Sequence, residues 1–230
     1  MASIRTMSYL MRVRMPDAPG ALGQLAVAIG TVGGDIRGVD IVGNGDAAED
    51  IGTVVDDIVV NLPSGCLPDA LITAAQEVDG VYVDSIRPFS GTVDRRGQVK
   101  MLADVADRRQ NRTEALDLMM DSLPQSMTAG WSIVLDTEPR THRVAASSAA
   151  PADNGKELES APVVEARVLN SEREDWIPEN WAVMDSALAA TPIQGTSLLL
   201  VIGRPGGPDF LLSEVEHLRQ MGSIVGAFFS

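Results

Sequence analysis

A turn near the start of the chain, residues 15–22 (MPDAPGAL), constrains the fold more than any other segment. It joins a stretch of alternating polarity, residues 7–15, to residues 21–32, where apolar side chains recur at helical spacing. The alternation predicts a strand, and the recurrence every three to four residues predicts an amphipathic helix. An acidic residue, a proline and a glycine at such a junction leave backbone N–H groups where a small anion can approach them.

The segments that follow this turn predict a small mixed domain. Alternation predicts strands over 36–42, 53–62 and 81–88, and helical spacing predicts a helix over 68–78. Glycine, asparagine and proline clusters separate these elements. The order strand, helix, strand, strand, helix, strand predicts a ferredoxin-like βαββαβ domain of the α+β class.

Residues 8–90 resemble an ACT domain, a small regulatory module. The resemblance rests on the order of the elements and on Asp17-Ala18-Pro19-Gly20-Ala21-Leu22, which is similar to the Asp/Asn-x-Pro-Gly-x-Leu turn of that family. The segment GGDI at 33–36 is similar to the family's entry into its second strand.

The resemblance implies a ligand, a position for it and a partner. A small amino acid or related metabolite is expected where the turn meets the second strand of another copy, so we expect a homodimer or higher homo-oligomer. The expected site residues are Asp17, Ala18, Pro19, Gly20, Ala21, Leu22, Asp35, Ile36, Arg37 and Val39. Met15 stands where serine-sensing members carry a histidine, which favours a more apolar amino acid than serine.

The turn also has a purely structural interpretation. Asp17 can cap the helix that follows, and Gly20 can serve only to allow the bend. A ligand site and a capped turn both fit the residues, and the sequence leaves the two open.

The second half of the chain predicts a helix over 98–123, ended by Pro124, and strands over 131–135, 142–146, 185–193 and 197–204. A last helix over 214–229 follows a capping box of Ser213 and Glu216. Segments 186–193, 198–204 and 206–210 and the pair Ser213-Glu214 together resemble the end of a GAF domain. The resemblance implies a small antiparallel sheet flanked by its first and last helices.

We therefore expect an ACT-like domain over 1–92, a linker or first helix over 93–126, and a GAF-like domain over 127–230. The region 147–181, where a GAF domain keeps its ligand pocket, has no counterpart in that resemblance. Whether the second half binds anything is left open.

Charge and composition exclude several classes of partner. The net charge of −14 argues against nucleic acid and against anionic membrane surfaces. A single cysteine rules out an intramolecular disulfide, and we see neither a signal peptide nor a membrane span, so we expect a cytoplasmic protein. Arginine far outnumbers lysine, which indicates a GC-rich genome, and we expect an actinobacterial source.

No motif combines a nucleophile with a base, and we expect neither a cofactor nor a metal. Cys66 would need a histidine base, yet His142 and His217 both lie in the other predicted domain. A metal site of Asp46, Glu49 and Asp50 is conceivable, but these residues belong to a hairpin tip.

Two adjacent aspartates interrupt the predicted strand over 53–62. Because neighbouring side chains of a strand point to opposite faces, one of Asp56 and Asp57 is expected on the open face of the sheet, solvated. The other is expected at a bulge or beside an arginine such as Arg12, Arg14 or Arg37.

These features together predict a non-catalytic regulatory or sensor protein. The alternative is an interaction subunit that controls an amino-acid enzyme in trans without a ligand of its own. A third hypothesis, an enzyme, would need acids or Arg143 to converge on a deep pocket in 147–181. Trp131 is expected in the core, whereas core and pocket are both open for Trp176 and Trp181.

Overall fold

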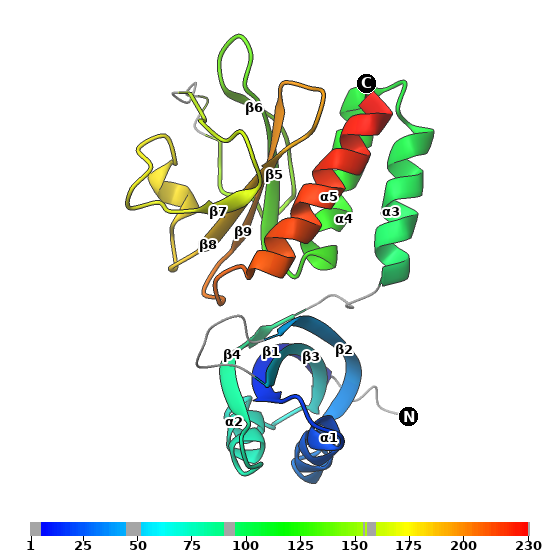
Figure 1. Ribbon diagram of the computed structural model, residues 1–230, viewed down its shortest axis with the longest axis vertical. Coiled ribbons are helices and arrows are strands. Elements are labelled where there is room, and N and C mark those ends of the chain that lie inside the picture. The colour runs from blue at the N-terminus through cyan, green and yellow to red at the C-terminus, as the bar shows by residue number, and fades with distance from the viewer. Residues whose placement is uncertain (1–5, 45–51, 90–94, 154, 156–159, 230) are drawn as a thin grey trace. The chain divides into compact units, whose positions relative to one another are not determined.

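The computed structural model of the chain describes residues 6–44, 52–89, 95–153, 155 and 160–229. It divides into two compact units, Met1–Val93 and Asp94–Ser230, hereafter unit 1 and unit 2 (Figure 1). Asp46, Glu49 and Asp50, the conceivable metal ligands, lie outside the described residues. No helix in the described ranges has the length and apolar character that a membrane crossing requires.

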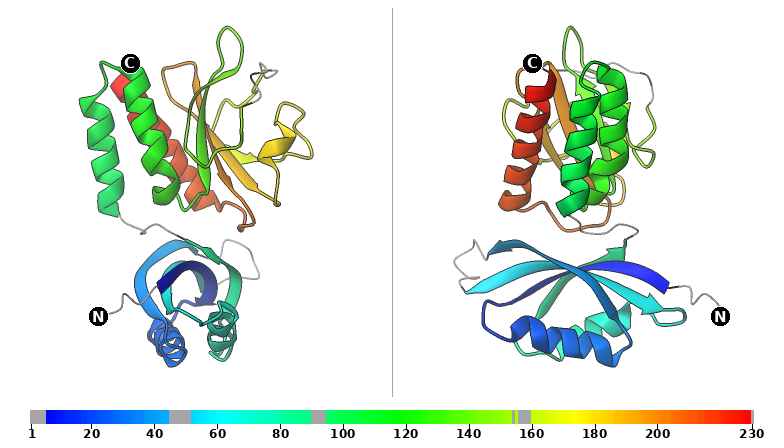
Figure 2. Two further views of the ribbon diagram at one scale, coloured as in Figure 1. Left: turned by 180° about the vertical axis from the view of Figure 1, so that it is seen from behind. Right: turned by 90° about the vertical axis from the view of Figure 1, so that its right-hand side faces the viewer.

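Unit 1 is an α+β fold in which two helices cover one face of an antiparallel sheet (Figure 2). Its elements are β1 (Thr6–Pro16), α1 (Ala21–Thr31), β2 (Asp35–Asn44), β3 (Thr53–Pro63), α2 (Asp69–Gln76) and β4 (Tyr82–Pro88). The strands lie in the order β2-β3-β1-β4, and each neighbouring pair is antiparallel. This is the ferredoxin-like arrangement expected from the sequence, with β2 and β4 at its edges.

The core of unit 1 lies between the sheet and the two helices. Every second side chain of β1 and β3 points to this side and packs against apolar residues of the helices: Tyr9, Met11, Val13, Met15, Leu25, Ile29, Ile58, Val60, Leu62, Leu71 and Ala75. The alternation over residues 7–15 therefore corresponds to the alternation of faces in β1, and the face with Tyr9, Met11, Val13 and Met15 is the one in the core.

In unit 2 two helices pack against one face of an antiparallel sheet, and a third helix packs against these two (Figure 1). Its elements are α3 (Arg95–Asp107), α4 (Arg112–Ser126), β5 (Trp131–Asp136), β6 (His142–Ala146), β7 (Arg167–Leu169), the 3₁₀ turn η1 (Glu179–Trp181), β8 (Ala187–Pro192), β9 (Leu198–Arg204) and α5 (Leu212–Phe229). The strands lie in the order β6-β5-β9-β8-β7. The expected antiparallel sheet with flanking helices is confirmed.

The expectation of a single helix over 98–123 is wrong, because the structure has two helices separated by residues 108–111. Asn111 starts α4 as its N-cap, and its side chain accepts a hydrogen bond from the Glu114 N–H. Pro124 does not end α4, which continues to Ser126. The carbonyl of Met120, which a proline at 124 cannot engage, accepts instead from the Ser132 hydroxyl at 3.4 Å.

The predicted capping box of the last helix is displaced by two residues. Helix α5 begins at Leu212, before Ser213, and the Glu214 carboxylate accepts from the Leu211 N–H at 2.9 Å. Glu214 therefore takes the role that was predicted for Glu216, because its carboxylate accepts from the N–H of the residue before the helix. Glu216 instead pairs with Arg219 on the exposed side.

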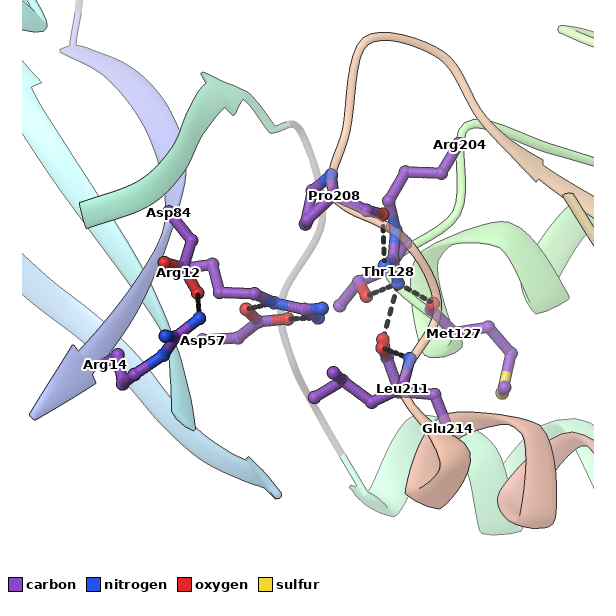
Figure 3. Close-up of polar contacts among 10 residues, drawn as sticks. All are labelled: Arg12, Arg14, Asp57, Asp84, Met127, Thr128, Arg204, Pro208, Leu211 and Glu214. Atoms are coloured by element: carbon purple, nitrogen blue, oxygen red, sulfur yellow. Dashed lines mark hydrogen bonds and ion pairs between the residues drawn. The ribbon is translucent and has the colours of Figure 1, made fainter. Parts of the chain in front are cut away.

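Buried Arg204, at the end of β9, joins α4 to the start of α5 (Figure 3). Its Nη2 donates to Glu214 at 2.6 Å and to the Thr128 hydroxyl at 2.9 Å, its Nε donates to the Thr128 carbonyl, and its Nη1 to the Pro208 carbonyl. The guanidinium lies 4.0 Å from the ring centroid of Phe210. The guanidinium of Arg204 thus holds together the segment after α4, the segment after β9 and the start of α5.

Candidate ligand-binding site

The predicted turn connects β1 to α1 and faces solvent. The Asp17 N–H donates to the Gly52 carbonyl at 2.8 Å, and the Ala21 N–H donates to the Ala18 carbonyl at 3.1 Å. Gly20 sits immediately before α1 with φ of +95°, a left-handed conformation that favours glycine. A Cβ atom at Gly20 would meet nothing within 4 Å, so the space before the helix is open.

The capping interpretation of the turn is wrong. The N-cap of α1 is Gly20, no side chain caps the helix, and its first turn contains no acidic residue. Asp17 is exposed and does not cap α1. The Ala18 carbonyl accepts from the Ala21 N–H, so within the described part of the chain the N–H groups of Leu22 and Gly23, with the partial positive charge of the helix end, are left to solvent or to a ligand.

The second half of the predicted site lies elsewhere on the sheet. Asp35 pairs with Asn61, which in turn pairs with Ser8 at the beginning of β1. The turn follows Pro16 at the other end of β1, eight residues further on, which corresponds to about 26 Å along a strand. One chain therefore brings together residues 17–22 but not Asp35, Ile36 and Arg37, and Val39 lies midway, opposite Ile58.

Strand β2 is an edge strand with apolar side chains at its surface. Val39 and Ile41 point to the side of the sheet that carries the helices, yet they are 38% and 65% exposed. Arg37 forms a solvent-exposed ion pair with Asp35, at 3.4 Å. An exposed, partly apolar edge is a surface on which another strand can pair.

Asp56 is a residue of this region that the sequence analysis did not assign to the site. It lies opposite Val13 in β1 and Ile41 in β2, so its side chain points to the face that α1 covers, and it is 3% exposed. Its Oδ1 has no hydrogen-bond partner in the described part of the chain. The expectation of a solvated aspartate is wrong here, because the register turns Asp56 inward.

The electrostatic surroundings of Asp56 are acidic. The pKa of Asp56 is raised from 3.8 to about 6, chiefly by burial and then by the carboxylates of Asp57, Asp40 and Asp17, in that order of size. The contribution of Asp17 places Asp56 within the electrostatic reach of the turn. A positive group beside Asp56 would relieve both the desolvation and the repulsion.

Asp57 pairs with an arginine, which is one of the two alternatives expected from the sequence for the second aspartate, the other being a bulge. Arg12 lies directly opposite in β1, and its Nε and Nη2 donate to the two carboxylate oxygens of Asp57 at 2.7 and 2.9 Å (Figure 3). Both side chains are buried. Asp57 is therefore neither solvated nor at a bulge in the β1–β3 pairing, and its charge is balanced within the sheet.

The face of the unit 2 sheet that carries no helices is filled by tryptophans. Trp131, Trp176 and Trp181 are buried in one cluster, with ring centroids 5.9 Å apart for Trp131–Trp181 and 6.2 Å for Trp176–Trp181. The indole N–H of Trp176 donates to Glu174, which also receives two hydrogen bonds from Arg167. These contacts assign all three tryptophans to the core.

Other candidate groups of the sequence do not converge. Cys66 is exposed, and no three His, Cys, Asp or Glu side chains within the described ranges are grouped as metal ligands. Arg143 donates to the Pro151 carbonyl at 2.7 Å. A hollow of about 350 Å³ at the end of α5 is lined by Arg109, Gln110, Arg112, Ala227, Phe228 and Phe229, but the Arg112 guanidinium already stacks on Phe229.

No protein-family model and no curated protein matches the chain. Among solved structures, the GAF domain of A. aeolicus nlh2 in an inactive state is similar at 13% identity, over 59% of this chain and 96% of that one, with a TM-score of 0.43. The GAF domain of an Acinetobacter phosphoenolpyruvate-protein phosphotransferase is similar at 14% identity, over 57% and 92%, with a TM-score of 0.45. The ACT domain of GTP pyrophosphokinase from Chlorobium tepidum is similar at 17% identity, over 37% and 100%, with a TM-score of 0.26.

The structures similar to this chain thus include both GAF and ACT domains, the two kinds of domain that the sequence resembles. At these identities and TM-scores the likeness concerns the fold alone. The fold class rests on the two strand orders, and the function has to be argued from the turn and its neighbours.

Proposed function

We propose that the chain is a non-catalytic regulatory protein that binds a small amino acid or related metabolite at residues 17–22. The observation that carries this proposal is the uncapped, solvent-facing start of α1 behind Gly20. A carboxylate placed there accepts hydrogen bonds from the N–H groups of the first turn and lies at the positive end of the helix dipole.

A second copy of the chain completes the site in this proposal. The residues expected from β2, Asp35, Ile36, Arg37 and Val39, lie too far along the sheet to reach the turn of their own chain. The exposed β2 edge supports pairing between copies, which would bring the strand of one copy near the turn of the other. Binding between two copies would then favour one arrangement of the dimer over others.

The absence of a catalytic role is part of the proposal. The only cysteine lies in unit 1 and both histidines lie in unit 2, which supports a site that binds without forming a covalent bond. The tryptophan-filled face of unit 2 supports placing the ligand in unit 1. A cytoplasmic location is proposed with it, on the sequence grounds already given.

Isothermal titration of the full chain against the twenty common amino acids tests the proposal. Gly20→Trp should abolish the heat of binding, because the indole would occupy the open space before α1. Gly65→Trp is the matched control: Gly65 has φ of +93° and equally open surroundings, but lies in the turn between β3 and α2. The control introduces the same backbone strain and should bind as the wild type does.

Two results would contradict this function. Heat from no amino acid would refute the sensor, and a stable enzyme partner captured from the native host would then favour the interaction subunit acting in trans. Equal binding by Gly20→Trp and Gly65→Trp would refute the position of the site. Sedimentation velocity of the wild type tests whether a second copy completes the site. A monomer at saturating ligand would contradict this, because no partner would then supply β2.

A further inference from the structure

We propose that Asp56 receives the cationic group of the bound metabolite, so that the site selects zwitterions such as α-amino acids over simple carboxylic acids. This inference rests on the proposed function, because it assumes that a ligand binds at the start of α1. It gives the ligand a second anchor of opposite charge.

The position of Asp56 allows this role. Its partner in β1 is Val13, whose side chain packs in the core under α1, so Asp56 lies on the same face as that helix. It lies three positions after Thr53, which pairs with Pro16 at the end of β1 where the turn begins. Its other neighbour is Ile41 of the edge strand, which is 65% exposed, so Asp56 lies one strand in from an exposed edge of the sheet.

The chemistry of Asp56 requires a partner that the described residues do not supply. A buried carboxylate oxygen without a hydrogen bond is destabilising, and few such groups persist in folded proteins without a role. The two arginines that flank Val13 in β1 point to the opposite face, where Arg12 engages both oxygens of Asp57 and Arg14 donates to Asp84. Asp57, Asp40 and Asp17 surround Asp56 with negative charge, which attracts an ammonium group and repels a second anion.

Asp17 is the obvious alternative for the ammonium group, because it belongs to the turn itself. Its side chain is exposed, so water and salt screen any ion pair that it forms. Asp56 is buried, and a charge-assisted hydrogen bond formed there is stronger. The start of α1 and the carboxylate of Asp56 therefore offer charges of opposite sign for the carboxylate and the ammonium group of an α-amino acid.

The test compares two variants with three probes on the full chain. The probes are the amino acid of the twenty that binds the wild type most tightly, its des-amino carboxylic acid and its decarboxylated amine. Asp56→Asn should weaken the amino acid by about 10- to 100-fold and leave the carboxylic acid within about threefold, because only the ammonium contact is lost. Asp17→Asn, which removes the same charge from the turn, should weaken the amino acid less than Asp56→Asn does, because an ion pair of the exposed Asp17 side chain is screened by water and salt.

The outcomes separate this inference from the function on which it rests. If Asp56→Asn binds the amino acid as the wild type does, or if Asp17→Asn takes the loss, Asp56 is not the receptor, while the ligand site stands. If no amino acid binds the wild type, both are overturned. Hydrogen exchange of β1 and β3 in Asp56→Asn checks that a loss of binding does not come from an unfolded unit 1.

Discussion

The substitution Asp56→Asn should flatten the dependence of unit 1 stability on pH. Asp56 is buried, and its pKa is raised from 3.8 to about 6, chiefly by burial and then by the neighbouring carboxylates. A raised pKa means that the folded state holds the proton more tightly than the unfolded state. This contribution to stability is complete below about pH 4 and is lost as the pH rises through about 6.

The size of the effect follows from the shift. Two pKa units correspond to about 3 kcal/mol over the whole titration, at about 1.4 kcal/mol per unit. Between pH 5 and pH 7.5 roughly 1–2 kcal/mol of this is lost. Asparagine cannot titrate, so the difference in unfolding free energy between these two pH values should fall by that amount, whatever the amide itself contributes at both.

The neighbouring residue provides the control. Asp57→Asn makes the same chemical change one position along β3, but it removes the charge that balances buried Arg12. Removing one partner of a buried ion pair destabilises by about 3–5 kcal/mol. We therefore expect two adjacent, identical substitutions to differ: the first changes the pH dependence, and the second lowers the stability of unit 1 at neutral pH.

Native-state hydrogen exchange read by mass spectrometry separates the two units. Peptides from β1 and β3 give the opening free energy of unit 1, after correction for the intrinsic exchange rate at each pH. All three tryptophans lie in unit 2, so urea unfolding followed by tryptophan fluorescence gives the stability of unit 2 and should be the same in both variants. Identical pH dependence in the wild type and Asp56→Asn would refute the burial argument.

Four further substitutions test local packing and capping, each with the same two measurements. Gly203→Ala should destabilise unit 2 by about 3 kcal/mol, because the new Cβ would lie 2.1 Å from the Trp131 ring. Gly30→Ala, whose new Cβ would meet nothing within 4 Å, should stabilise unit 1 by about 0.5–1 kcal/mol. Arg204→Lys should destabilise unit 2 by about 3–5 kcal/mol, because lysine cannot reproduce the forked contacts with Glu214 and its neighbours. Asp17→Ala should change unit 1 by less than about 0.5 kcal/mol, since Asp17 caps nothing; a loss near 1 kcal/mol would restore the capping interpretation.

The elements of unit 1 could be predicted because each is bounded by a residue that breaks the preceding pattern. The strand expected over 7–15 runs in the structure from Thr6 to Pro16, and the helix expected over 21–32 runs from Ala21 to Thr31. The break between α3 and α4 was missed, because no glycine or proline marks it and only the local bond from Asn111 does.

The site could be predicted only in part, because register is not visible in one sequence. Alternation indicates that Asp56 and Asp57 face opposite sides, but not which side each faces or whether that side is covered. Pairing with β1 decides both: it sets Asp57 against Arg12 and Asp56 against Val13. The burial of Trp176 and Trp181 was equally out of reach, since the segment that carries them has no periodicity and its packing depends on distant strands.

The two units differ in how they treat buried charge, and this difference favours unit 1 as the place where a ligand acts. In unit 2 the buried guanidinium of Arg204 donates hydrogen bonds to Glu214, three carbonyls and a hydroxyl. The buried Nε2 of His217, which has no hydrogen-bond partner among the described residues, is a weaker exception, because one ring nitrogen is less costly to bury than a carboxylate. In unit 1 the carboxylate of Asp56 and the start of α1 are both left unsatisfied, one negative and one positive, on the same side of the sheet. Departures from polar satisfaction concentrate at functional sites, and a single zwitterion would satisfy both of these.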